Sequence, residues 1–207
     1  MHKLAFGAIV LVTAAVTFLL TSLFWLVAFN LGGRDAPAAE NVITETTEPG
    51  ARAELVLGPG GLAVPVAGVG VEELVDTYSQ ARAGGARVHD AIDIVAPAGT
   101  PVVAAAEGIV EKLFFSPGGG GITVYVRSPD RRWIYYYAHL RDYATGLEEG
   151  REVERGAPLG TVGSSGNASP AAPHLHFAVH RMGPDDDWHG GTPVNPFPLL
   201  AGRREGR

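Results

Sequence analysis

Residues 173–179 are Pro-His-Leu-His-Phe-Ala-Val, an apolar run in which two histidines stand one position apart. Such a run predicts a β-strand, in which alternate side chains face the same side. His174 and His176 therefore share one face, while Leu175 and Phe177 turn to the other. Two imidazoles side by side on a rigid strand form half of a metal site.

Residues 89–93, His-Asp-Ala-Ile-Asp, offer the other half of such a site. If this segment is extended, His89 and Asp93 also face one side. Nitrogen and oxygen donors on two strands are ligand types that Zn²⁺ prefers. Each motif alone is more often explained by a hydrogen-bonded histidine in a half-buried strand. A third histidine, His139, also lies in an apolar run, where an unpaired imidazole is costly. The constellation therefore favours a metal site over packing.

Four segments in this order resemble the LytM/lysostaphin family of zinc endopeptidases, peptidase family M23. They are residues 89–93, 98–102, 137–140 and 173–177. The similarity covers residues 62–200. One departure is Ala91, where the family often has Gly; a methyl group is tolerated in a strand, so this position reads as a subfamily feature.

The resemblance implies a role for each of five residues. His89, Asp93 and His176 match the family's ligands for one Zn²⁺ per chain, and His139 and His174 match its two catalytic histidines. Three protein ligands leave a fourth tetrahedral position for water, which is typical of catalytic rather than structural zinc. Which of the two catalytic histidines is the general base stays open.

The function implied by the resemblance is zinc-dependent cleavage of peptide bonds, with peptidoglycan stem or cross-bridge peptides as substrate. One alternative is a non-catalytic module of the same fold that regulates or localises another cell-wall hydrolase. The five intact positions argue against that alternative. Another is an endopeptidase that acts on proteins, which the sequence does not exclude.

The composition restricts the possible partners. The 207 residues carry a formal net charge of −6, and Lys and Arg do not cluster, which argues against a nucleic-acid partner. The chain has no Cys, which excludes disulfides, a cysteine zinc site and a thiol nucleophile. Nothing in the sequence indicates the oligomeric state.

The N-terminus carries a long apolar segment. No charged residue occurs in residues 4–31, a run longer than the ~20 residues that span a bilayer. We therefore expect residues 1–31 to form a single-pass anchor in a bacterial inner or cytoplasmic membrane. Lys3 precedes the run and favours a cytoplasmic N-terminus, with the catalytic domain in the periplasm or cell exterior. The competing interpretation is a cleaved signal peptide, because Ala-Pro-Ala at 36–38 resembles a cleavage site.

The rest of the chain divides into a linker, a domain and a tail. Residues 32–54 lack hydrophobic periodicity and predict a flexible linker; residues 55–200 form the peptidase domain, and residues 201–207 a polar tail. With 28 Gly and 15 Pro, the domain should contain many turns and short strands. The predicted fold class is mainly β, an antiparallel sandwich or barrel-like sheet with one short helix.

The expected elements follow from local patterns. Apolar residues at 71, 74, 75 and 78 recur at helical spacing and predict a short helix that ends at Gly84 and Gly85. The predicted strands are residues 62–66, 91–95, 102–105, 108–115, 122–127, 133–140, 159–162 and the His-x-His segment.

Further residues are candidates for the walls of the cleft. Simple alternation places Tyr135 and Tyr137 on the face of His139, so one of them is a candidate for binding substrate. Residues 163–173 are expected to form one wall and Trp188 to lie at the rim. His180 shares the parity of the two histidines but lies beyond the motif, and we interpret it as structural.

Overall fold

The computed structural model describes residues 55–202, with only the backbone of Ala83. The predicted anchor (1–31), the linker (32–54) and most of the tail lie outside the described residues. Within residues 55–202 no helix is both long and apolar enough to cross a membrane.

Most of the regular structure is β. In chain order the elements are η1 (Val71–Glu73), β1 (Ala81–Arg82), η2 (Ala83–Gly85), β2 (Arg87–Val88), β3 (Ile92–Val95), β4 (Pro101–Val103), β5 (Gly108–Ser116), β6 (Gly121–Arg127), β7 (Trp133–Tyr143), β8 (Glu152–Val153), β9 (Pro158–Val162), β10 (His174–Arg181), β11 (Thr192–Val194) and α2 (Phe197–Ala201).

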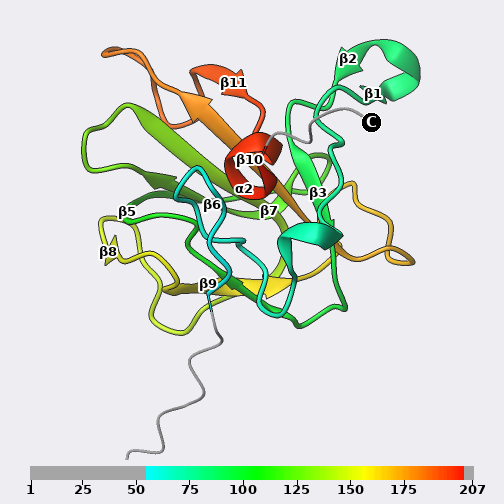
Figure 1. Cartoon of the computed structure of the whole chain (residues 1–207), viewed down its shortest axis with the longest axis horizontal. Helices are drawn as coiled ribbons and strands as arrows, with labels where there is room; N and C mark the ends of the chain where they lie inside the picture. The colour runs from blue at the N-terminus through cyan, green and yellow to red at the C-terminus, as the bar shows by residue number, and fades with distance from the viewer. Residues whose placement is uncertain (1–54, 203–207) are drawn as a thin grey trace, which may run out of the picture. The chain divides into compact units, whose positions relative to one another are not determined.

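Nine strands form one antiparallel sheet, and β10 lies inside it (Figure 1). Strand β10 pairs with β7 along one edge, and with β3 and then β11 along the other. Strands β6, β5 and β8 continue the sheet beyond β7, while β9 joins β7 to β4. The predicted mainly β, antiparallel fold is confirmed. An inner position in the sheet fixes the backbone of the His-x-His segment on both sides.

The two faces of this sheet differ in what covers them. On β10, Leu175 and Phe177 are fully buried, and they belong to one apolar core with Tyr137 of β7. Leu74 and Leu200, from the N-terminal segment and α2, complete that core. The opposite face of the sheet is therefore the one that can carry polar chemistry.

The helix predicted from residue 71 is wrong. Only the single 3₁₀ turn η1 forms, and Leu74 already has an extended backbone with ψ of 140°. Val75, which the helical pattern would have buried, is 60% exposed. Gly84 and Gly85 do not end a helix; they lie in the turn of hairpin β1–β2, with φ of +68° and +95°. Glycine adopts this left-handed conformation without the steric penalty that other residues meet.

The strand predicted for residues 62–66 is reduced to two isolated bridges, Ala63 to Leu57 and Val66 to Val102. Pro65 lies between the two bridged residues and has no backbone N–H to donate to a ladder. The side chains of Leu62 and Val64 are nevertheless buried in the core. The apolar pattern therefore located the buried residues without specifying a strand.

Strand β7 contains a bulge that matters for the site. Its pairing register with β6 shifts between Tyr137 and Leu140, and its register with β9 shifts just beyond Leu140. His139 lies at the first shift with φ of +61°, a left-handed conformation that is uncommon for a residue other than glycine. An extra residue in one strand changes which side chains share a face.

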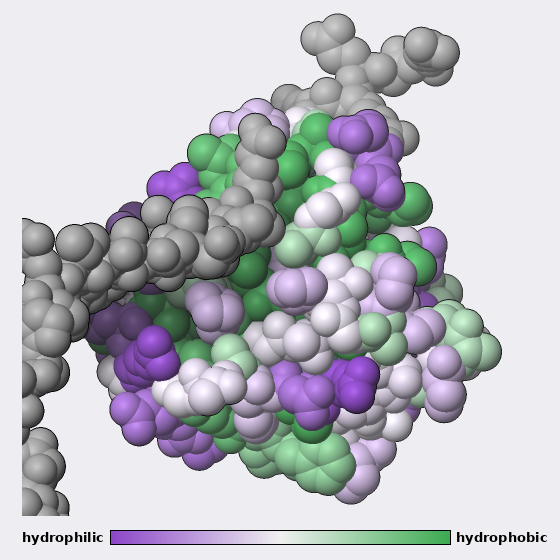
Figure 2. All heavy atoms as spheres, turned by 90° about the horizontal axis from the view of Figure 1, so that it is seen from below, coloured by the Kyte–Doolittle hydropathy of each residue, from purple (hydrophilic) through white to green (hydrophobic). Residues whose placement is uncertain are grey.

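The described surface has no uniform character. On the face drawn in Figure 2, hydrophilic, near-neutral and apolar residues are intermixed. The exposed large apolar side chains include Val75, Val95 and three residues of β5, namely Ile109, Phe114 and Phe115.

Tyr137→Phe should lower the free energy of unfolding by about 1–3 kcal/mol, the usual cost of a buried donor without a partner. The fully buried Tyr137 hydroxyl accepts a 2.8 Å hydrogen bond from the backbone N–H of Ala105. Urea unfolding measures the change. Tyr135→Phe is the matched control, because the Tyr135 hydroxyl makes no hydrogen bond within residues 55–202. A shift no larger than that of the control would contradict the prediction.

Candidate metal centre and active site

Strands β10 and β3 bring His176 and Asp93 together. These two residues are direct partners in the antiparallel register, so their side chains lie on the same face of the sheet. That face is the one opposite the apolar core. The Asp93 backbone N–H donates to the Thr77 hydroxyl at 2.9 Å, which fixes the strand at this point.

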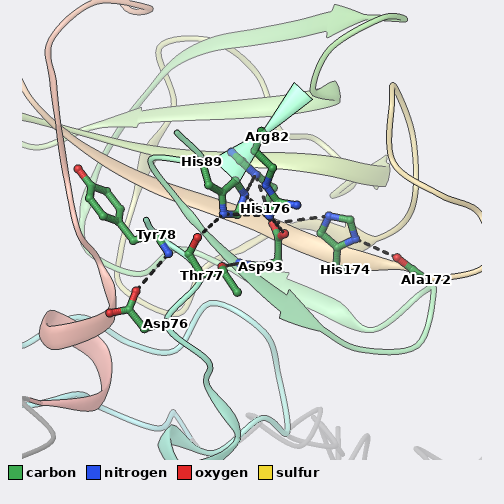
Figure 3. A network of polar contacts seen from close by, with 9 residues as sticks. All are labelled: Asp76, Thr77, Tyr78, Arg82, His89, Asp93, Ala172, His174 and His176. Atoms are coloured by element: carbon green, nitrogen blue, oxygen red, sulfur yellow. Dashed lines mark hydrogen bonds and ion pairs between the residues drawn. The ribbon is translucent and has the colours of Figure 1, made fainter. Parts of the chain in front are cut away.

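His89 joins them from outside the strand. The strand predicted for residues 91–95 is observed as β3 from Ile92, but the segment from His89 to Asp93 is not extended throughout, because Asp90 has φ of +60°. The His89 side chain is 4% exposed, and its Nδ1 lies 2.9 Å from the Thr77 carbonyl oxygen, which can only accept. Nδ1 therefore carries the proton, and Nε2 turns its lone pair toward Asp93 and His176 (Figure 3).

The three side chains form a compact donor set. The distances between donor atoms are 3.0 Å from His89 Nε2 to His176 Nδ1, 3.1 Å from His89 Nε2 to Asp93 Oδ1, and 3.3 Å from His176 Nδ1 to Asp93 Oδ1. Ligands at ~2.0–2.1 Å from a tetrahedral zinc ion are about 3.3–3.4 Å apart. Asp93 Oδ1 is buried and has no hydrogen-bond partner. A buried carboxylate oxygen needs a compensating partner, so these residues fit a metal ion.

Two residues outside this donor set, Arg82 and Thr77, hold its members in place. Arg82 Nη2 donates to Asp93 Oδ2 at 2.5 Å, and Thr77 contacts both His89 and Asp93 as described above (Figure 3). Neither residue is predicted from the sequence. A signal for Arg82 was present, since Gly84-Gly85 flanked by short segments is typical of a hairpin turn as well as of a helix end.

His139 and His174 lie next to the donor set and next to each other. Their ring centroids are 5.0 Å apart, and the His139 ring lies 5.6 Å from that of His176. Each Nδ1 lies 2.9 Å from a backbone carbonyl oxygen, that of Ser165 for His139 and that of Ala172 for His174. A carbonyl can only accept, so both rings carry the proton on Nδ1 and leave Nε2 as the basic nitrogen.

Ser165 fixes the position of the bulge that carries His139. Its hydroxyl donates to the Leu140 carbonyl at 2.6 Å and accepts from the Ile122 N–H at 2.9 Å. Gly121 packs so closely against Ser165 that an added Cβ would lie 2.2 Å from the hydroxyl oxygen. The segment 163–173 was predicted to form a wall of the cleft; it also orients a histidine through Ser165.

The electrostatics favour neutral imidazoles beside a charged carboxylate. Burial lowers the pKa of His139 to about 4, and burial also lowers the pKa of His176. Burial alone would raise the pKa of Asp93, but His176 and His89, wherever their rings carry a proton toward the carboxyl in the metal-free protein, outweigh burial and hold this pKa well below its usual range. Neutral imidazoles are the form that binds metals and accepts protons.

The bulge overturns the tyrosine prediction. Tyr137 points into the core and Tyr135 is also buried, so neither lines the site. Tyr136 instead packs edge-on to His176 with ring centroids 5.8 Å apart. A row of aromatic rings continues from Tyr136 through Tyr125 to Trp188, with centroids 4.5 and 4.8 Å apart. Trp188 thus lies at the outer end of this row.

His180 lies apart from the donor set. Its Nδ1 is 3.1 Å from the Gly190 carbonyl oxygen, and it contacts none of the five residues discussed above. It anchors the loop between β10 and β11, as a structural residue would.

The fold and the donor set together fit one class of protein, the metallopeptidases: an antiparallel β domain in which a His/Asp/His donor set adjoins two further histidines. The sequence pattern described as Peptidase family M23 matches residues 87–196, more than half of the chain. The chain belongs to this family, which confirms the resemblance seen in the sequence.

Relatives and solved structures agree with this assignment. The chain is 34% identical over 130 residues to the L-Ala--D-Glu endopeptidase of Bacillus subtilis. This match covers 60% of this chain and 38% of that protein. It is 36% identical over 94 residues to the peptidoglycan DD-endopeptidase ShyC of Vibrio cholerae, covering 45% and 20%. The catalytic domain of lysostaphin from Staphylococcus simulans superposes with a TM-score of 0.52 at 29% identity, covering 61% of this chain and 90% of that domain. The matched segments thus cover well under half the length of the Bacillus subtilis and Vibrio cholerae relatives.

In the metal-free protein, the lowered pKa of His139 predicts a pH-dependent stability. A histidine whose folded pKa of about 4 lies below its unfolded value of about 6.5 stabilises the fold fully above pH 6.5 and loses this contribution as the pH falls toward 4. The loss should reach about 3 kcal/mol, because each pKa unit corresponds to 1.36 kcal/mol. Urea unfolding of wild type and His139→Asn at pH 7 and pH 4 isolates the contribution of His139. Between pH 7 and pH 4 the free energy of unfolding should fall less in the variant than in wild type. Equal losses would contradict the prediction.

Proposed function

We propose that this chain is a zinc-dependent endopeptidase that hydrolyses peptide bonds in peptidoglycan. The observation that carries the proposal is the donor set His89, Asp93 and His176, with an unpartnered carboxylate oxygen beside two histidines whose Nε2 atoms are basic. The name of the Vibrio cholerae relative, a peptidoglycan DD-endopeptidase, supports peptidoglycan as the substrate, and the name of the Bacillus subtilis relative specifies an L-Ala–D-Glu bond. Those two names specify different bonds, so we propose the substrate class and not one bond.

The proposed mechanism assigns one task to each group of residues. His89, Asp93 and His176 would hold the zinc ion, which when bound polarises the scissile carbonyl and activates the attacking water. His139 and His174 handle the protons. One Nε2 accepts the proton from the attacking water, and the pair returns a proton to the leaving amine. His139 is suited to accept a proton, because burial keeps it neutral at pH 7.

The hydrogen bonds to carbonyl oxygens serve this proton transfer. Each Nδ1–H is held by a backbone acceptor, so neither ring can flip and present the wrong nitrogen. Once an Nε2 takes a proton, the carbonyl oxygen also stabilises the resulting imidazolium. The rings are therefore oriented before the substrate binds.

The experiment is digestion of purified peptidoglycan by the full-length chain in detergent, with the products identified by mass spectrometry. Wild type should release peptides, a chelator should stop the reaction, and added Zn²⁺ should restore it. His139→Asn is the matched inactive control. Zinc binding without cleavage of peptidoglycan would favour the non-catalytic module that regulates another hydrolase. Cleavage of a protein substrate but not of peptidoglycan would favour the protein endopeptidase.

We also propose that residues 1–31 anchor the chain as a single membrane pass, with the catalytic domain in the periplasm or cell exterior. The uncharged run from residue 4 to 31 supports this. Fractionation of cells and the mass of the mature N-terminus test it. A soluble product that begins near residue 39 would instead establish a cleaved signal peptide.

A further inference from the structure

Arg82 makes direct polar contact with the donor set, although it is not one of the five residues discussed above. Its Nη2 lies 2.5 Å from Asp93 Oδ2, and the two side chains are 33% and 18% exposed. The same Nη2 lies 3.0 Å from each ring nitrogen of His89 (Figure 3). Because His89 Nδ1 donates to Thr77, only Nε2 of that ring has a lone pair, and this lone pair also faces the donor set. A metal ion that binds His89 Nε2 would use this lone pair, so Arg82 would then keep only its contact with Asp93.

The two oxygens of Asp93 therefore have different surroundings. Oδ2 accepts a short, charge-assisted hydrogen bond from Arg82, whereas Oδ1 is buried without a hydrogen-bond partner between the two histidines. A carboxylate without such a hydrogen bond can rotate and bind a cation through either oxygen or through both. A guanidinium on one oxygen removes this freedom.

We propose that Arg82 is a positioning residue for the metal centre: it holds Asp93 Oδ2, so that Oδ1 alone faces the ion. This deepens the proposed function and rests on the same site. Hydrogen-bond partners of metal ligands orient those ligands, and their loss typically costs about 10–100-fold in metal affinity. The position of hairpin β1–β2 then depends on metal binding, because Arg82 belongs to that hairpin.

The hairpin has few other means of holding its position. Strands β1 and β2 pair only with each other, as a two-stranded sheet separate from the main one. A two-stranded hairpin is marginally stable by itself. At its base a backbone hydrogen bond joins His89 N–H to the Gln80 carbonyl at 2.9 Å. Thermodynamic coupling is reciprocal: if the ordered hairpin favours metal binding, then the bound metal favours the ordered hairpin to the same extent.

The sign of the effect separates this proposal from simple charge repulsion. A guanidinium close to a cation repels it, so loss of the positive charge should strengthen zinc binding. Loss of a positioning hydrogen bond should weaken it. The chain offers a matched control in Arg87, the cross-strand partner of Arg82 on the same hairpin. Arg87 is exposed and makes no ion pair within the described residues.

The test measures zinc affinity of the full-length chain by competition with a chromophoric chelator. Arg82→Met should bind zinc about 10–100-fold more weakly than wild type, and Arg82→Lys should recover part of the loss through its ammonium. Arg87→Met should match wild type. Zinc binding by Arg82→Met that equals or exceeds that of Arg87→Met overturns the proposal. If Arg82→Met does not fold, Arg82→Gln, which is polar but uncharged and too short to reproduce the guanidinium contact, replaces it with the same expectation.

Two further readouts do not depend on activity. The visible spectrum of bound Co²⁺ should change in Arg82→Met and not in Arg87→Met, because the carboxylate is free to bind differently. Zinc should slow amide exchange of residues 81–89 in wild type and less so in Arg82→Met. An unchanged spectrum together with equal protection would contradict the positioning role. Wild type that binds zinc without cleaving peptidoglycan would refute the proposed activity and leave this inference intact.

Discussion

His176→Ala is expected to abolish zinc binding and peptidoglycan cleavage together. The side chain supplies one of three donor atoms, and the substitution leaves two protein ligands where catalytic zinc sites have three. Loss of a ligand should weaken zinc binding by more than the ~10–100-fold that loss of an outer partner costs. Zinc content after dialysis and cleavage of peptidoglycan measure both effects.

His180→Ala is the matched control for that substitution. His180 lies on the same strand and side of the sheet, four residues further on, but it contacts Gly190 instead of the donor set. We expect it to keep its zinc and its activity. If His176→Ala retained one zinc per chain, the assignment of the metal centre would be wrong.

His139→Asn is expected to lower kcat by about 10²–10⁴-fold, the usual contribution of a general acid or base, and to leave zinc content unchanged. Asparagine suits this position for two reasons. It tolerates the left-handed backbone at φ of +61°, and its amide can still donate to the Ser165 carbonyl. It cannot replace the basic Nε2. The substitution therefore removes proton transfer with little change of structure.

The control for this second prediction is His189→Ala. His189 is exposed and its ring packs on Trp188, outside the donor set. We expect activity close to that of wild type. Loss of zinc in His139→Asn would mean that His139 holds the metal centre together and would contradict a purely catalytic role.

The sequence predicted the strands well wherever a single apolar pattern coincided with a regular ladder. The predicted bounds of β6 and β10 are close to the observed ones, and the first four residues of β10 alternate between more exposed and buried as the pattern predicts. In such strands the burial of one face by the core specifies the register, because a shift by one residue would expose every apolar side chain.

The errors share a cause, which is that local patterns do not record contacts between distant segments. The spacing of residues 71–78 suits a helix, yet Thr77 lies in an irregular segment and contacts His89 and Asp93. Alternation along β7 fails at His139, since this strand must pair with β6 and β9 around a bulge that Ser165 holds in place. Neither requirement is visible in the residues nearby.

The sequence by itself determined the mainly β class, the family and the residue types of the site, because strand periodicity and the two histidine motifs are local in the chain. Only the tertiary structure decided which atoms meet. The tautomers of His89, His139 and His174 follow from carbonyl groups supplied by other segments. The contact of Arg82 with Asp93 depends on a hairpin whose place is set by packing. Hydrogen-bond partners are chosen in three dimensions, so spacing along the chain does not specify them.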